Sequence, residues 1–185
     1  MIKVLGIDQS SNFGWAVGHR GMRRPVWGVV DLPKPVGREG VTFLKVYDFV
    51  CRMITEHEIT HCFFEETIKK PTDNLNVLWQ QIGLATHIQS ACVSVGIPSQ
   101  QVLIRDWRKR FCGKTKAPPG LKGQHSRQWW KDQAVKSCFE RGWLTDDDNA
   151  ADALGIMDYG LCCVDPRYTQ ETDALFRRAE DRETP

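Results

Sequence analysis

The chain has 185 residues, a length that suits one domain with a sizeable core. Apolar residues make up 41% and charged residues 26%, which is typical of a globular protein rather than a disordered one. No apolar run approaches the roughly 20 residues of a membrane span, and the N-terminus lacks the pattern of a secretory signal. We therefore expect a cytoplasmic protein with no membrane partner.

Three short strands open the chain. Residues 3–8 form an apolar run that ends on Asp8, and residues 14–19 and 26–32 give two more runs of strand type. The connections between them are short, so the pattern predicts an antiparallel meander. A proline-containing segment then ends the third strand, because proline cannot continue the hydrogen-bond ladder.

The middle of the chain alternates helices and strands. Apolar residues recur at helical spacing over 38–57 and 74–95, and short apolar runs at 59–64 and 101–104 predict strands. Strands separated by a helix pair in parallel, so we expect a five-stranded mixed sheet flanked by helices, an α/β fold. The apolar stripe of the helix at 74–95 is interpreted first as core packing, with a dimer face as the alternative.

A strongly basic segment follows the fifth strand. Residues 105–131 contain nine Lys or Arg residues and one acid, so this segment carries +8 while the rest of the chain carries −6. Such asymmetry favours a polyanionic partner. We expect one or two helical turns at 106–111, a loop over 113–124, a helix from Ser126 to about 141, and a last helix from about 145 to 163. Residues 1–164 would form the domain and residues 165–185 a charged tail.

Three acidic positions stand out on this frame. Asp8 ends the first strand, Glu65 follows the apolar run at 59–64, and Asp152 lies inside the last helix. Asp8 has a plain alternative as a turn cap, but Asp152 lies beyond the first helical turn, where the helix dipole explains acids. Asp148 and Asn149 can share the helical face of Asp152. Parallel pairing of the first and fourth strands would bring Asp8 and Glu65 to one sheet edge.

An all-oxygen site of this kind suits a hard cation. Mg²⁺ and Mn²⁺ are held by carboxylates together with substrate phosphates. Two such ions roughly 3.5–4 Å apart can stabilise the attacking and leaving oxygens of a phosphodiester displacement. The acids and the basic segment together predict a metal-dependent nuclease that uses two ions per active site.

Three segments, GIDQSSNFGWAV, FFEETI and DDNAADALGIMDYG, occur in the order and spacing of the RuvC family of Holliday-junction resolvases. The chain resembles this family over about residues 1–163, and its smaller phage or prophage members most. The resemblance implies a ribonuclease H-like fold, a homodimer joined through the helix at 74–95, and Mg²⁺- or Mn²⁺-dependent cutting of four-way DNA junctions in recombination and repair. A phage-encoded member would work in the host cytoplasm.

The resemblance also assigns residues. Asp8, Glu65 and Asp152 match the family's catalytic acids, while Asn149 stands where many bacterial members have another Asp, so Asn149 or Asp148 would complete the metal site. Glu66 ranks second to Glu65 because it points to the other side of a regular strand. In the family, the region after the fifth strand contacts DNA. Here that region supplies Arg105, Lys109, Lys114, Lys116, Lys122 and Arg127.

Other interpretations stay open at this point. The chain could be a branched-DNA binding protein with little or no catalysis, an alternative that Asn149 makes worth testing. It could also be another ribonuclease H-like nuclease that acts on flaps or RNA–DNA hybrids. Trp129 and Trp130, which lie in a predicted helix, are expected to be core anchors rather than surfaces for stacking on bases.

Overall fold

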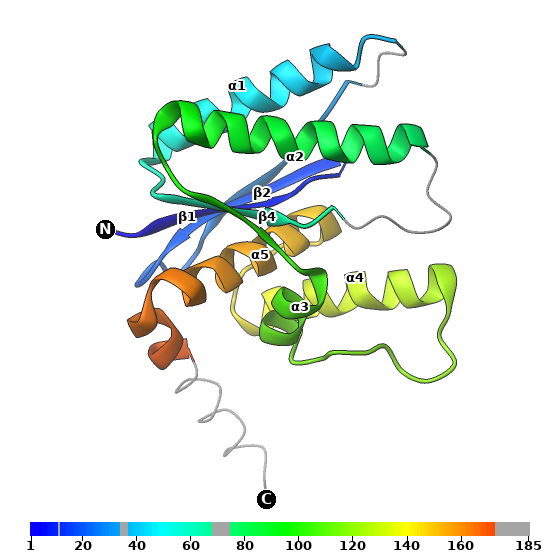
Figure 1. The fold of residues 1–185 in the computed structure, drawn as a ribbon. Coiled ribbons are helices and arrows are strands. Elements are labelled where there is room, and N and C mark those ends of the chain that lie inside the picture. The colour runs from blue at the N-terminus through cyan, green and yellow to red at the C-terminus, as the bar shows by residue number, and fades with distance from the viewer. Residues whose placement is uncertain (11, 34–36, 68–74, 173–185) are drawn as a thin grey trace, which may run out of the picture.

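A computed structural model describes residues 1–10, 12–33, 37–67 and 75–172. Its five strands form one sheet in the order β3-β2-β1-β4-β5 (Figure 1). The strands are β1 (Lys3–Asp8), β2 (Asn12–His19), β3 (Val26–Asp31), β4 (His61–Glu65) and β5 (Ser99–Val102). β1, β2 and β3 pair antiparallel, and β4 and β5 join in parallel. The predicted mixed sheet is therefore confirmed.

Helices cover both faces of this sheet (Figure 1). The five helices are α1 (Glu39–His57), α2 (Leu75–Val95), α3 (Ile104–Cys112), α4 (Gly123–Glu140) and α5 (Asp148–Val164). α1 and α2 cover one face, while α5 covers the other and is itself covered by α3 and α4. No helix among the described residues is long and apolar enough to span a membrane.

The alternation of side chains along the strands creates two cores. Leu5 and Ile7 of β1 point into the core beneath α1 and α2, whereas Val4 of β1 packs with α5 on the opposite face. In β4, Phe64 joins the first core and Phe63 the second. Because residues two apart share a face, Asp8 and Glu65 belong to the α5 side of the sheet.

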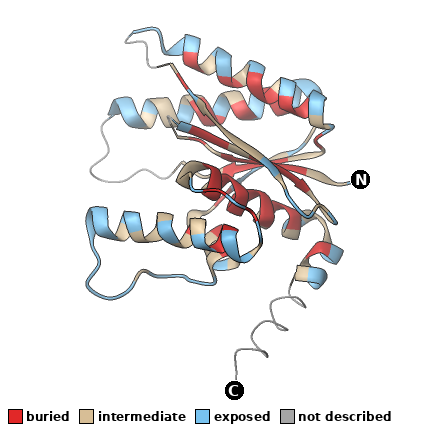
Figure 2. Ribbon diagram, turned by 180° about the vertical axis from the view of Figure 1, so that it is seen from behind, coloured by how far each residue is buried: buried red, intermediate tan, exposed pale blue. Residues whose placement is uncertain are grey.

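α5 lies unusually close to the sheet because glycines line the strands beneath it. A Cβ on Gly6 would lie 2.5 Å from the backbone oxygen of Ala153, and a Cβ on Gly14 would overlap the carbonyl group of Asn149. α5 is also buried along most of its length, as Figure 2 shows for the helix beneath the sheet. Because Gly6 and Gly14 have no side chain, the N-terminal end of α5 can approach β1 and β2 this closely.

Several predicted boundaries were wrong, among them those of β5, α3 and α4. β5 ends at Val102, and the segment that follows it forms the nine-residue α3 because Ile104, Trp107 and Phe111 recur at helical spacing and pack toward α5. α4 begins at Gly123, so Ser126 lies in the helix instead of capping it. The start of α4 is exposed, and water can therefore satisfy the first N–H groups without a side-chain cap.

The start of the predicted tail packs against the domain. Residues 166–172 are helical, and the buried Tyr168 hydroxyl donates a 2.6 Å hydrogen bond to Oδ1 of Asp158 in α5. Arg20 forms ion pairs of 3.2 Å with Asp165 and 3.1 Å with Glu171. These contacts attach the segment to both α5 and the β2–β3 hairpin. Residues 173–185 of the predicted tail lie outside the described residues.

Candidate active site

The carboxyl ends of β1 and β4 meet at one edge of the sheet. Ile7 pairs with Phe64, so the next residue of each strand, Asp8 and Glu65, lies at the same level. Both belong to the face covered by α5, and Glu65 is further fixed by its pairing with Val102 of β5. The structure therefore brings together the two strand acids selected from the sequence.

α5 supplies the remaining predicted residues from its first two turns. The N-cap is Asp147, whose Oδ1 accepts hydrogen bonds of 2.9 Å from the Asn149 N–H and 3.0 Å from the Ala150 N–H. This cap fixes the start of the helix where it crosses Gly14 of β2. The Ser10 hydroxyl donates a 2.7 Å hydrogen bond to the Asn12 carbonyl oxygen and lies 3.3 Å from Oδ1 of Asn149.

The electrostatics show that the acids form one cluster. Burial raises the pKa of Asp8 well above its usual value, and the charges of Asp152, Glu65 and Asp148 raise it further. Burial likewise raises the pKa of Asp152 to about 7; Arg108 opposes this rise, and Glu65 and Asp148 add to it. Ionising all four carboxyl groups together is therefore costly unless a positive charge enters the site.

Two cations that the sequence reasoning left out lie within this cluster. Arg108 of α3 places a guanidinium nitrogen 3.9 Å from Oδ2 of Asp152, and Lys131 of α4 forms an ion pair with Asp148. Arg108 could have been found from its spacing, because it lies three and four residues from the apolar positions Phe111 and Ile104 of α3. No sequence pattern indicated Lys131, because its ion pair with Asp148 depends on how α4 packs on α5.

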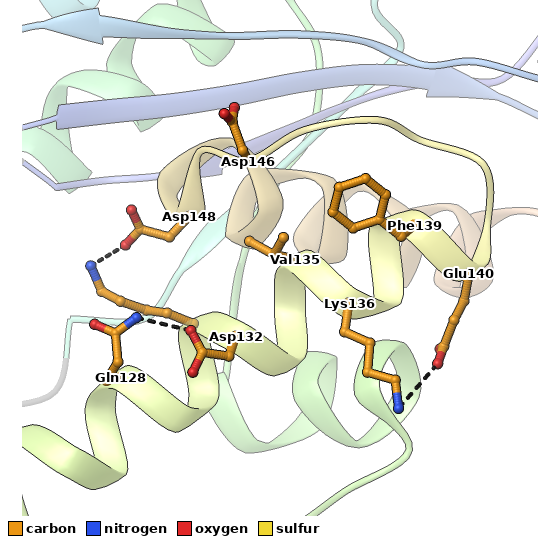
Figure 3. Close-up of a pocket in the computed structure, with 9 residues that line it drawn as sticks. Gln128, Asp132, Val135, Lys136, Phe139, Glu140, Asp146 and Asp148 are labelled. Carbon is orange, nitrogen blue, oxygen red and sulfur yellow. Dashed lines mark hydrogen bonds and ion pairs between the residues drawn. The ribbon is translucent and has the colours of Figure 1, made fainter.

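Asp148 also borders a groove between α4 and the beginning of α5. The groove has a volume of about 770 Å³ and runs past Asp146 and Phe139, with ion pairs and a hydrogen bond along its walls (Figure 3). Its walls carry both signs of charge, including a 3.6 Å pair between Lys136 and Glu140. The groove therefore has no clear preference for an anion.

The acid cluster fits a divalent cation in its chemistry and in its unmet bonding. Within the described residues, no three His, Cys, Asp or Glu side chains lie at the spacing of a metal coordination shell. Asp148 and Asp152 form ion pairs with Lys131 and Arg108. However, Oδ1 of Asp152 is buried without a hydrogen-bond partner, which is an oxygen available to a cation.

The six predicted DNA contacts are all exposed, on α3, on α4 or on the segment between them. They are Arg105, Lys109, Lys114, Lys116, Lys122 and Arg127. The expectation for the neighbouring tryptophans was wrong, because Trp129 and Trp130 do not belong to either core. Their rings pack edge to face on each other at 4.8 Å, with Lys114 over Trp129 and Arg108 over Trp130. α4 is thus attached to α3 and to the segment between these two helices by cation–π contacts.

If these basic residues contact phosphates, the double substitution Lys122→Ala with Arg127→Ala should weaken four-way junction binding and flatten its salt dependence. Each lost phosphate contact lowers the slope of log K against log salt by about 0.9, so we expect a decrease of roughly 2. Fluorescence anisotropy at several salt concentrations measures this. Lys45→Ala is the control, since Lys45 is exposed on α1 across the sheet. An unchanged slope in the double variant would remove these residues from the DNA interface.

The sheet order and the helix layers define the class of fold, which is ribonuclease H-like. No family model and no curated protein sequence matches the chain. Solved structures do match, and Holliday junction resolvases are among them. Thermus thermophilus RuvC superposes with a TM-score of 0.64 at 16% identity, covering 84% of this chain and 91% of that one.

Two further structures agree. T. thermophilus RuvC in complex with a Holliday junction substrate gives a TM-score of 0.67 at 14% identity, over 85% of this chain and 91% of that one. The yeast mitochondrial Holliday junction resolvase Ydc2 gives 0.57 at 12% identity, over 85% and 76%. The chain therefore has the fold of the RuvC resolvases, as the sequence resemblance implied. At identities of 12–16% the likeness shows the fold alone.

Proposed function

We propose that this protein is a divalent-ion-dependent endonuclease that cuts branched DNA, with the four-way junction as its substrate. The observation that carries the proposal is the convergence of Asp8, Glu65 and Asp152 on one face of the sheet, beside a +8 segment. Burial and neighbouring carboxylates raise the pKa values of Asp8 and Asp152 there. The Holliday-junction substrate bound to T. thermophilus RuvC, a protein of the same fold, supports this choice of substrate.

Asp8, Glu65 and Asp152 would hold two Mg²⁺ or Mn²⁺ ions, with Asp148 or Asn149 completing the site. Bound there, the ions supply an activated water and stabilise the departing 3′ oxygen of the phosphodiester. The protein's own cations have a separate role. Lys131 and Arg108 offset part of the acidic charge and offer donors to the phosphate that enters the site.

The test is cleavage of a synthetic four-way junction in Mg²⁺, Mn²⁺ and Ca²⁺. We expect nicked product with the first two ions only, and at least about a hundredfold less product from Glu65→Gln and from Asp152→Asn, with junction binding retained. Asp48→Asn is the matched control because Asp48 is exposed on α1, away from the site. Normal cutting by both site variants would refute the assignment.

A flap and an RNA–DNA hybrid belong in the same assay. Faster cleavage of either than of the junction would favour another ribonuclease H-like nuclease. Tight junction binding with no cleavage in any divalent ion would favour a binding protein. Two observations support the binding-protein alternative. Asn149 brings no negative charge to the site, and Asp148 already forms an ion pair with Lys131.

The proposal includes a homodimer formed through the N-terminal half of α2. The predicted stripe of this helix divides, because Ile88 and Cys92 are buried, whereas Leu75 and Trp79 remain 68% and 71% exposed. A groove of about 700 Å³ lies beside them, between α2 and the beginning of α1. Two symmetric cuts at a junction require two active sites, and this apolar face offers a surface for pairing.

Trp79→Glu should therefore convert the dimer to a monomer, since a charge in a self-complementary apolar interface is repeated on both subunits. Sedimentation velocity measures the change, and we expect an affinity loss of at least about a hundredfold, given the weight of buried Trp anchors. Leu144→Glu, at a site 65% exposed on the opposite side, is the control. A variant that sediments like the wild-type dimer would place the interface elsewhere.

A further inference from the structure

The indole of Trp107 makes a directed contact with a proposed metal ligand. Its Nε1–H donates a 3.2 Å hydrogen bond to Oε2 of Glu65, which lies 42 positions earlier in the chain. Trp107 is fully buried. A buried indole N–H needs an acceptor, and in this protein the acceptor is a carboxylate of the acid cluster instead of a backbone carbonyl.

Close packing holds the donor in place. A Cβ on Gly155 of α5 would lie 2.8 Å from the Trp107 ring, so the indole rests directly on the α5 backbone. The guanidinium of Arg108 lies 5.2 Å from the Trp107 ring centroid and 4.9 Å from that of Trp130. The ring therefore has little freedom to turn, and the direction of its N–H is set by α3, α4 and α5 together.

We propose that Trp107 is a positioning residue that orients the Glu65 carboxylate for divalent-ion binding, an inference that rests on the proposed nuclease function. A hydrogen bond to one carboxylate oxygen fixes the side-chain torsions and so directs the whole group. Groups that orient metal ligands in this way are worth about 10–100-fold in metal affinity or activity.

The contact also links the basic segment to the acid cluster. α3 begins the basic segment, and its consecutive residues Trp107 and Arg108 reach acids from two different elements, Glu65 of β4 and Asp152 of α5. A displacement of α3 would therefore be transmitted to the acids through Trp107. This arrangement gives the DNA-facing segment a direct mechanical connection to the ion site.

The experiment compares Trp107→Phe with Phe111→Leu. Trp107→Phe keeps an aromatic ring at this position. It removes the N–H donor and one of the two fused rings of the indole. The second also trims a buried ring of α3 that rests on Gly155, but Phe111 has no hydrogen bond to an acid. Free Mn²⁺, followed by electron paramagnetic resonance without DNA, gives the ion affinity independently of activity, at a temperature where circular dichroism shows both variants folded.

We expect Trp107→Phe to weaken Mn²⁺ binding by about 10–100-fold and Phe111→Leu to change it by less than about threefold. In a Glu65→Ala background, Trp107→Phe should have no further effect, because the carboxylate on which it acts is gone. Equal losses in the two α3 variants, or an equal loss with and without Glu65, would show that Trp107 acts only by packing. A wild-type protein that neither binds Mn²⁺ nor cuts junctions would overturn the proposed function itself, which is a distinct result.

Discussion

Asp8→Asn is expected to stop strand cutting and, in metal-free buffer, to raise the melting temperature of the protein. Burial and three neighbouring carboxylates raise the pKa of Asp8, so its ionised form strains the folded state at neutral pH. An amide has nearly the same shape without the charge. Each kcal/mol relieved corresponds to roughly 2–4 °C in a domain of this size. Loss of an ion ligand should lower the cleavage rate by about two to three orders of magnitude.

The pH dependence of this stabilisation has a definite sign. A carboxyl group whose pKa is raised on folding holds a proton that the unfolded chain releases, so the folded state loses stability as pH rises through that interval. For Asp152 the interval runs from about 3.8 to about 7, and Asp8 shifts in the same direction. The advantage of Asp8→Asn over wild type should therefore be absent at acidic pH, where the Asp8 carboxyl is protonated in both states, and should grow as the pH rises.

Thermal unfolding followed by circular dichroism, with and without Mn²⁺ at pH 6 and pH 8, measures both effects. Wild type should gain stability from Mn²⁺ by mass action, about 2.7 kcal/mol at a hundred times the dissociation constant, and more readily at pH 8. Asp8→Asn should lose most of that gain. The control is Asp48→Asn, which removes an exposed charge from α1. A wild-type melting temperature that exceeds that of Asp8→Asn in metal-free buffer at pH 8 would contradict this account.

The sequence was sufficient for the sheet because its signals there are local. The alternation in β1 and β4 places Ile7 and Phe64 on one face and therefore Asp8 and Glu65 on the other, and short links specify an antiparallel meander. The arrangement of the acids in the first turns of α5 could also be predicted. Asp148, Asn149 and Asp152 share a helical face because of their spacing, whatever the tertiary contacts are.

The partners of those acids could not be read in the same way. Helical spacing places Arg108 on the apolar face of α3, but it does not show that Asp152 is the acid this residue meets. Lys131 meets Asp148 only because α4 packs over α5, and a sequence of alternating basic and aromatic residues is compatible with many such packings. The same holds for Trp130, which a helical pattern assigns to a core although it lies against Arg108. The density of positive charge in this segment did not show which of its cations would point toward the acid cluster.

The site thus depends on how closely a helix approaches a sheet, and Gly14 controls that distance. A Cβ at this position would overlap the Asn149 carbonyl at the second residue of α5, and a backbone atom cannot rotate away as a side chain can. The helix start must therefore shift, at a cost of about 1–3 kcal/mol in stability. The shift would displace Asn149 from Ser10, and with it the acids of the first turns from Asp8.

Gly14→Ala should accordingly lower junction cleavage by about a hundredfold, the loss expected when reacting groups are misplaced by roughly 1 Å, while junction binding through the basic segment changes little. Single-turnover cleavage and anisotropy, measured side by side, separate the two. Gly40→Ala is the matched control, because a Cβ on Gly40 of α1 would meet nothing within 4 Å. If Gly14→Ala cut at the wild-type rate, the acids would not need the close approach of α5. The ion site would then have to lie away from the contact between α5 and β2.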